Sequence, residues 1–251
     1  MIGAKERRIW LMNYREFREA IEDTDTVILP IGVCEAHGPH LPLGTDFIIP
    51  EWLSLRIAER VNALIAPPIY YGVAIGLSGY LGTLTIREST LESLVYDVLS
   101  ELSSNGFEKV LIMNGHGGSA QTVSISNAMR RAWQDFRIKS AMIMWWDLAK
   151  DLTEQVFGGS GGHAGVDEAA LVMAVDRSLV RGGIEEEEIY SLRSGLQVVP
   201  IPGSMIAYDS KFLKELPDEV RVAEFAEKLI ERIVSEVTKL LEGWERQEVV
   251  F

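Results

Sequence analysis

The stretch "TVILPIGVCEAHGPHLPLGTDF" (26–47) decides the fold, because a buried-strand pattern runs in it directly into a cluster of polar side chains. Its first eight residues are mostly apolar and rich in β-branched side chains, as in a strand of a parallel sheet. Prolines and glycines then exclude a regular helix through the cluster. The strand therefore delivers Glu35, His37, His40 and Asp46 to its carboxyl end.

Strand and helix patterns alternate along the rest of the chain. The predicted elements are a strand at 26–33, a helix over 91–102 stopped by Gly106, a strand at 109–115, a helix at 120–133 and a strand at 139–148. This alternation indicates an α/β fold with three layers, α/β/α, around a mostly parallel central sheet. The 251 residues, 47% of them hydrophobic, can bury one substantial core, so we expect a single domain over residues 1–251.

Near the C-terminus, one apolar stripe at helical spacing predicts a long amphipathic helix. The stripe contains Val222, Phe225, Leu229, Ile233, Val237, Leu240 and Trp244. We expect it to pack against the sheet or another subunit. The acidic run 185–188 is interpreted as a solvated helix start without chemistry.

Composition narrows the class of partner. The chain carries 24 basic and 37 acidic residues, a net charge of -13, which argues against a nucleic-acid surface and favours a small-molecule substrate. A single cysteine, Cys34, excludes an internal disulfide, and the N-terminus lacks the apolar core of a signal peptide. Because no window of eighteen apolar residues free of charge occurs, we expect no membrane span and a cytoplasmic location.

All four histidines fall in stretches punctuated by glycine or proline. His37 and His40 lie in "EAHGPH", His116 in "NGHGGS" and His163 in "GGSGGHAG". Glycine lets the backbone approach a ligand closely, and loops at strand carboxyl ends are where open α/β sheets place their sites. The histidines therefore predict a functional site.

Several common chemistries do not fit these motifs. "NGHGGS" has no lysine for a phosphate-binding P-loop, and no dinucleotide-binding glycine fingerprint occurs. The H-E-x-x-H helix of zinc proteases is excluded because Pro39 and Pro42 interrupt the motif. Cys34 adjoins the cluster, but we expect its side chain to alternate away from Glu35, which disfavours a cysteine nucleophile.

Carboxylates combined with imidazoles, without a thiolate cluster, suit a divalent ion such as Zn, Mn or Fe. Glu35 and His37 are two residues apart in an extended stretch, so their side chains project to the same face. Asp46 can return to them after the Pro-Gly turn, and a carboxylate in that position is a natural bridge between two ions.

The motifs resemble those of the creatininase (creatinine amidohydrolase) family. The segment 29–46 resembles the family's first motif, "NGHGG" and "HAGVDE" resemble its second and third, and the resemblance covers most of residues 26–175, with "GYLGT" (79–83) and "MWWD" (144–147) between them. It implies the creatininase-like fold, two divalent ions per chain, a metal-bridging hydroxide as nucleophile, and a homo-oligomer, commonly a hexamer.

Site residues follow from the same resemblance. It makes Glu35 and His37 ligands of different ions, Asp46 the bridge and His116 a further ligand of the ion bound by Glu35. Glu168 is the expected last carboxylate ligand, with a solvent-facing helix carboxylate as the alternative. Three carboxylates against two divalent ions leave a charge of +1, which a hydroxide would neutralise.

Two histidines remain outside this ligand set. We expect His40 to orient a ligand or hold its loop. His163, in a glycine-rich loop expected to move, would be the proton shuttle or substrate clamp; the alternative is that it caps the helix starting near Val166. With Glu168, it completes the set of predicted catalytic residues.

The chain departs from creatininase itself at Gly117 and Gly118, where that enzyme has an aromatic residue and a glutamate, and in the missing tryptophan before His163. The expected function is therefore a metal-dependent amidohydrolase of a non-peptide or cyclic C–N bond, such as a formamide, lactam or cyclic urea. The alternatives are a peptidase of a small peptide precursor and a non-catalytic metal-binding protein that keeps the fold.

Overall fold

The structure is a computed structural model that describes residues 6–193, 195–208 and 215–247. Its centre is a parallel sheet of four strands in the order β2-β1-β3-β4. The strands are β1 (Thr26–Ile31), β2 (Leu64–Ile65), β3 (Lys109–Asn114) and β4 (Lys139–Met144). Every residue of β1 and β3 is buried, as expected for the middle of a parallel sheet.

Strand register brings three carboxyl ends to the same edge of this sheet. Ile31, the last residue of β1, pairs with Asn114 at the end of β3, and Asn114 pairs with Met144 at the end of β4. The segments that follow these strands therefore start side by side. Sites of open α/β sheets form at such an edge.

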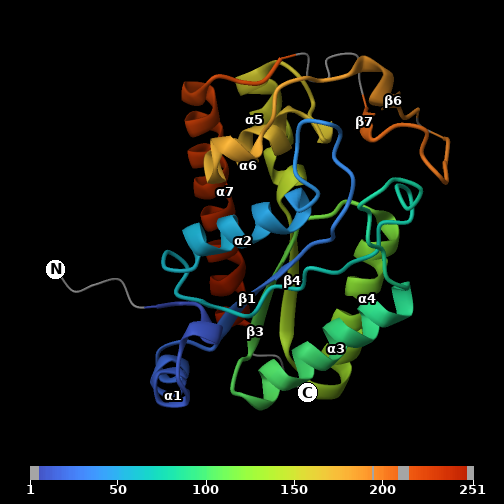
Figure 1. Ribbon diagram of the computed structural model, residues 1–251. Helices are drawn as coiled ribbons and strands as arrows, with labels where there is room; N and C mark the ends of the chain where they lie inside the picture. Colours follow the sequence, from blue (N-terminus) through green and yellow to red (C-terminus); the bar gives the residue numbers. More distant parts are fainter. Residues whose placement is uncertain (1–5, 194, 209–214, 248–251) are drawn as a thin grey trace.

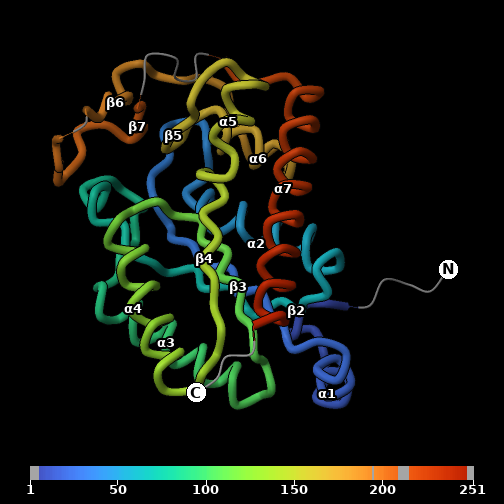
Figure 2. The backbone as a smooth tube through the Cα atoms, turned by 180° about the vertical axis from the view of Figure 1, so that it is seen from behind, coloured from blue at the N-terminus to red at the C-terminus, as the bar shows by residue number. Residues whose placement is uncertain are grey.

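Helices cover both faces of the sheet (Figures 1 and 2). One face carries α3 (Glu88–Ser104) and α4 (Ser119–Phe136); the other carries α2 (Thr45–Ile57), α5 (Trp145–Phe157), α6 (Val166–Val175) and α7 (Glu219–Arg246). Alternate strand residues serve the two cores: Val27 and Leu29 pack with α3 and α4, whereas Ile28 packs with the other helices. The predicted three-layer α/β/α architecture is confirmed.

The remaining helical elements are short. They are η1 (Ile9–Leu11), α1 (Tyr14–Asp23), η2 (Arg177–Leu179) and η3 (Glu186–Glu188). Asn13 caps α1 by accepting hydrogen bonds from the backbone N–H groups of Arg15 and Glu16. Of the acidic run expected to be a solvated helix start, Glu186–Glu188 form the 3-10 turn η3, in which Glu186 and Glu187 are exposed and Glu188 is half-buried.

The predicted C-terminal helix is confirmed as α7. Its stripe from Val222 to Val237 is buried, and Leu240 and Trp244 are partly buried against the same core. The helix packs chiefly against α5 and α6. No helix in the described ranges is long and apolar enough to cross a membrane.

One predicted strand was too long. The segment 139–148 was expected to be extended throughout, but β4 ends at Met144 and α5 begins at Trp145. Tryptophan favours strands in general, but here Trp145 is buried in the core shared by α5, α6 and α7. Asp147 lies in the first turn of the helix, where a negative charge is favourable.

A second, small sheet was not predicted. Its order is β5-β7-β6, with β5 (Gly162–His163) antiparallel to β7 (Met205–Ala207) and β6 (Ile189–Ser191) parallel to β7. His163 pairs with Ile206 in this sheet. The histidine expected in a mobile glycine-rich loop is therefore held in a strand, because residues more than forty positions later pair with it.

Candidate metal centre

Five segments meet at the carboxyl edge of the central sheet, and together they carry every site residue predicted from the sequence. The segment after β1 supplies Glu35, His37 and His40; α2 supplies Asp46; the segment after β3 supplies His116; β5 supplies His163 and α6 supplies Glu168. Their side chains are buried, except that of His163, which is partly buried. Charged and imidazole groups so deeply buried require close partners.

Asp46 reaches the site from the first turn of α2, not from an irregular turn as expected. The helix begins at Thr45, whose backbone N–H donates to Pro42 O. Its first turn sits directly on the ends of β1 and β3: a Cβ added at Gly32 or Gly115 would lie 2.2 or 1.8 Å from the backbone oxygen of Asp46. Only glycine at both positions lets the helix approach so closely.

The carboxylate of Asp46 faces a different histidine with each oxygen. Oδ1 lies 3.0 Å from His37 Nε2, and Oδ2 lies 3.0 Å from His116 Nδ1. Glu35 Oε2 is also 3.0 Å from His116 Nδ1, on one side, and Glu168 Oε2 is 3.6 Å from His37 Nε2, on the other. Asp46 is thus shared between two groups of side chains.

Two groups of three residues could each hold a metal ion. They are Glu35, Asp46 and His116, and His37, Asp46 and Glu168; within each group the potential ligand atoms all lie within 4.8 Å of one another. Although they lie 3.0 Å from His116 Nδ1 and Asp46 Oδ1, the buried atoms Glu35 Oε2 and His37 Nε2 form no hydrogen bond within the described ranges. Buried polar atoms without partners are unusual in a folded protein, so the donor set fits divalent ions.

The pKa values of the cluster show how strongly its groups interact. Burial alone would lower the pKa of His37, but the carboxylates of Asp46, Glu168 and Glu35 raise it to about 10. Burial raises the pKa of Glu168 to about 8 despite the opposing charge of His37. The metal-free cluster therefore keeps protons at positions where a cation would replace them.

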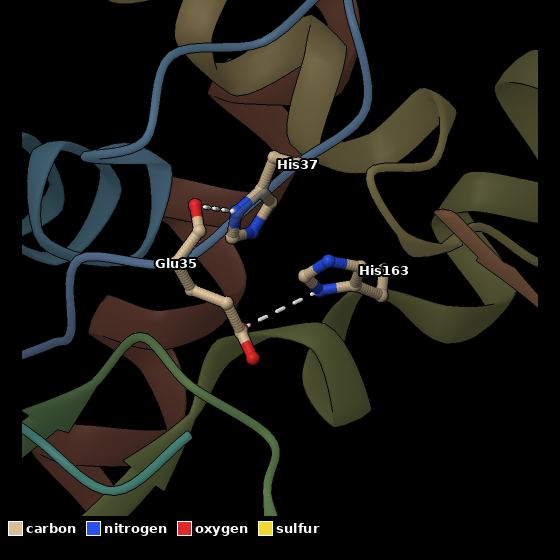
Figure 3. Close-up of side chains that lie close together, drawn as sticks. All are labelled: Glu35, His37 and His163. Carbon is tan, nitrogen blue, oxygen red and sulfur yellow. Dashed lines mark hydrogen bonds and ion pairs between the residues drawn. The ribbon is translucent and has the colours of Figure 1, made fainter. Parts of the chain in front are cut away.

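His163 lies beside Glu35 and His37 (Figure 3), and a contact to the backbone fixes its tautomer. Its Nε2 is 2.7 Å from the carbonyl oxygen of Ala36, which can only accept, so Nε2 carries the proton. The unprotonated Nδ1 faces Glu35 Oε2 at 3.7 Å, and the ring lies 4.1 Å from that of His37. Burial and the charge of His37 lower the pKa of His163 to about 4.

His163 does not cap α6, which was the alternative interpretation. The residue before the helix is Gly165, with no side-chain hydrogen bond to the first turn. Glu35, His37 and His163 form a third group whose potential ligand atoms lie within 4.8 Å of one another. The imidazole thus faces the same space as the two groups that share Asp46.

His40 lies outside all three groups and acts on them through the backbone. Its Nε2 donates to the carbonyl oxygen of Ala164 at 3.1 Å, and the N–H of Ala164 donates to Glu168 Oε2 at 2.6 Å. Burial lowers the pKa of His40 to about 4, so the ring is neutral at pH 7. His40 thus holds the backbone of Ala164, the residue whose N–H orients Glu168.

Cys34 points away from the cluster, as the alternation of side chains predicted. Its Sγ donates to the carbonyl oxygen of Gly82 at 3.3 Å, and burial raises the pKa of the thiol. The neighbouring Thr83 hydroxyl accepts from the N–H of Ala36 at 3.1 Å. The segment 79–83 therefore braces the chain between Cys34 and His37.

Sequence reasoning missed three buried polar residues beside the site. Asn114 and Gln121 hydrogen-bond around His116, and Asp167 accepts from the N–H of Gly162 at 3.2 Å. Burial raises the pKa of Asp167 to about 6. Asn114 and Asp167 fall inside the quoted motifs, so their position was the available signal; Gln121 gave none, because it lies outside those motifs and one of its two partners, Val73, is 48 residues away.

The family profile described as creatininase, creatinine amidohydrolase, matches residues 10–241. Creatinine amidohydrolase of Pseudomonas putida is 29% identical over 188 residues, which cover 67% of this chain and 72% of that protein. The mycofactocin precursor peptide peptidase of Mycolicibacterium smegmatis is 32% identical, over 42% of this chain and 44% of the peptidase. The 3-dehydro-scyllo-inosose hydrolase of Thermotoga maritima is 27% identical, over 56% and 45% of the two chains.

Solved structures agree with the fold. A structure named "Creatininase Mn" superposes with a TM-score of 0.79 at 22% identity, over 94% of this chain and 98% of that one. A creatininase variant of the Zn-Zn type gives a TM-score of 0.79 at 21% identity over the same shares. The predicted creatininase-like architecture is confirmed.

Proposed function

The chain belongs to the creatininase family, and we propose that it is an amidohydrolase that uses two divalent metal ions, Zn, Mn or Fe. The observation that carries this proposal is the placement of Asp46, whose two carboxylate oxygens face His37 and His116. Glu35, Asp46 and His116 would hold one ion, and His37, Asp46 and Glu168 the other. Three carboxylates balance most of the charge of two such ions.

Two ions at these positions would lower the pKa of a bound water and polarise the carbonyl of an amide. The side chains of this chain then have separate tasks. The histidines present lone pairs in fixed directions: Nδ1 of His37 lies 3.0 Å from the carbonyl oxygen of Glu35, to which it donates, so Nε2 is left to act as ligand. Because the cluster is buried, bulk water is excluded and the electrostatic interactions between its groups are stronger than they would be in solvent.

His163 is the proposed proton shuttle. Its Nδ1 carries a lone pair toward the cluster, while Nε2–H is anchored to Ala36 O. The imidazole can take a proton at Nδ1 from the attacking water and give it to the leaving nitrogen. Glu168 combines a ligand role with a hydrogen bond from the N–H of Ala164, which fixes its carboxylate on the side of the cluster that faces His37.

The proposed substrate is a small molecule with a non-peptide or cyclic amide bond. The relative from Pseudomonas putida is named for hydrolysis of a small molecule of this kind, creatinine. Gly117 and Gly118 occupy the positions where creatininase has larger side chains, so creatinine need not be the substrate. A peptidase is the second candidate, favoured by the peptide peptidase that is 32% identical.

The test is turnover by metal-loaded protein of creatinine, formamides, lactams, cyclic ureas and short peptides in parallel. Hydrolysis of the non-peptide amides, lost on chelation and restored by metal, would support the proposal. Cleavage of peptides alone would favour the peptidase. Metal binding without turnover of any amide would favour the non-catalytic alternative. The mass of the native particle would test the homo-oligomer, with a hexamer as the form that the family resemblance implies.

A further inference from the structure

The buried side-chain amide of Asn114 hydrogen-bonds both backbone groups of His116, its N–H and its carbonyl oxygen. Asn114, the last residue of β3, has no exposed surface. Its Nδ2 donates to the carbonyl oxygen of His116 at 2.8 Å, and its Oδ1 accepts from the N–H of His116 at 3.3 Å. A side chain that hydrogen-bonds both the N–H and the carbonyl oxygen of one residue holds the peptides on both sides of it and leaves that residue little freedom to rotate.

A second buried amide fixes the orientation of the first. Gln121, fully buried in α4, donates from Nε2 to Asn114 Oδ1 at 2.9 Å, and its Oε1 accepts from the N–H of Val73 at 2.9 Å. This bond requires Asn114 to present oxygen toward Gln121 and nitrogen toward His116 O. A Cβ at Gly72 would lie 2.1 Å from Gln121 Oε1, so the amide is also closely enclosed.

These hydrogen bonds fix the backbone of His116, and the imidazole nitrogen nearest that backbone, Nδ1, faces the carboxylates of Glu35 and Asp46. Nδ1 of His116 lies 3.0 Å from both Glu35 Oε2 and Asp46 Oδ2. Only two side-chain torsions separate Nδ1 from the backbone, so a shift of the backbone moves Nδ1 almost directly. On the far side of the ring, a Cβ at Gly118 would lie 2.3 Å from Nε2, so the loop leaves room for this one ring position.

We propose that Asn114 and Gln121 are positioning residues for the metal centre, which fix the backbone of His116 and thereby place its Nδ1 against Glu35 and Asp46. This inference rests on the metal-ligand set of the proposed function. Neither amide touches the His37, Asp46 and Glu168 group in any hydrogen bond of the described residues. The two groups should therefore differ in their response when the amides are removed.

The experiment measures Zn²⁺ affinity of chelator-stripped protein by competition titration, in the full chain. Asn114→Ala removes both hydrogen bonds to the backbone of His116, whereas Gln121→Met removes only the hydrogen bond that orients the Asn114 amide. Ser124→Ala is the matched control, because this buried hydroxyl of α4 donates to Ala120 O and makes no hydrogen bond to His116 among the described residues. We expect Asn114→Ala to lower the affinity for one of the two ions by about 10- to 100-fold and Gln121→Met to lower the affinity for the same ion less. Ser124→Ala should change the affinity for neither ion.

A double-mutant cycle separates positioning from general destabilisation. In a His37→Ala background, which leaves the Glu35, Asp46 and His116 group, Asn114→Ala should keep its full effect. In a His116→Ala background it should change the affinity of the remaining ion by less than about twofold. An equal loss in both backgrounds, or unchanged affinity in Asn114→Ala and Gln121→Met, would overturn the inference. Wild-type protein that binds no ion would instead overturn the proposed function, and the inference with it.

Discussion

The carboxylate of Asp46 lies 3.0 Å from Nδ1 of His116, a residue 70 positions later in the chain. Asp46 comes from the first turn of α2 and His116 from the segment after β3. Glycines at the ends of β1 and β3 allow the contact by letting the helix rest on the strands. The same carboxylate faces His37 with its other oxygen, so one residue joins both halves of the site.

Substitution of single ligands should separate them from supporting residues. Glu35→Gln, His37→Ala and His116→Ala each remove a group that faces the proposed ions, so each should abolish tight binding of at least one. His40→Ala leaves all these groups in place and should weaken binding by only about 10- to 100-fold, as changes outside the ligand set do. Metal titration of the purified variants checks this. Complete metal loss in His40→Ala would place that imidazole among the ligands.

Metal binding should release protons and strengthen as the pH rises. In the metal-free protein the pKa of His37 is raised to about 10 and that of Glu168 to about 8, so both groups hold protons at pH 7. An ion must displace those protons, and affinity therefore falls as the pH decreases below these values. Calorimetric titration at pH 7 in buffers of different ionisation enthalpy measures the protons released. Zero release would contradict the assignment of both residues as ligands.

Removal of the His163 imidazole should affect turnover and leave metal binding intact. We expect His163→Ala to keep both ions and to lower kcat by about 10² to 10⁴, the usual effect of losing a general acid or base. Steady-state rates and metal content are measured on the same sample. Unchanged rates would exclude the shuttle, and lost metal would make His163 a ligand of the third group.

Close packing at Gly115 predicts a stability effect with a clear control. A Cβ there would lie 1.8 Å from the backbone oxygen of Asp46, so Gly115→Ala should displace α2 and lower the free energy of unfolding by about 1–3 kcal/mol. Gly182→Ala is the control, because nothing lies within 4 Å of a Cβ at that position. Denaturant unfolding of the metal-free proteins compares the two. Equal stability of Gly115→Ala and the wild type would contradict the packing described.

Local patterns predicted the framework well, because buried strands and amphipathic helices have distinct periods. The strand before Glu35 and the stripe of α7 are examples. Errors arose where distant contacts decide local structure. Trp145 is helical because it fills the core beside α6, and His163 is extended because β7 pairs with it. Neither contact leaves a trace in the neighbouring sequence.

The same distinction between local patterns and distant contacts applies to the site. The residues proposed as metal ligands could be predicted because their types and order match a family pattern, and the structure brings them together. Gln121 could not be predicted, because its role depends on bonds to Asn114 and to Val73, 48 residues earlier. An amide within a helix has no distinctive local signal.

The central claim is that Asp46 bridges two ions, and the number of metal ions per chain in Asp46→Ala tests it most directly. Asp97→Ala is the control, because Asp97 is an exposed carboxylate on α3. The wild-type protein and this control should each bind close to two divalent ions per chain. Asp46→Ala removes one ligand from each ion at once, so elemental analysis after dialysis should find neither. Two ions retained by Asp46→Ala with unchanged affinity would contradict the account.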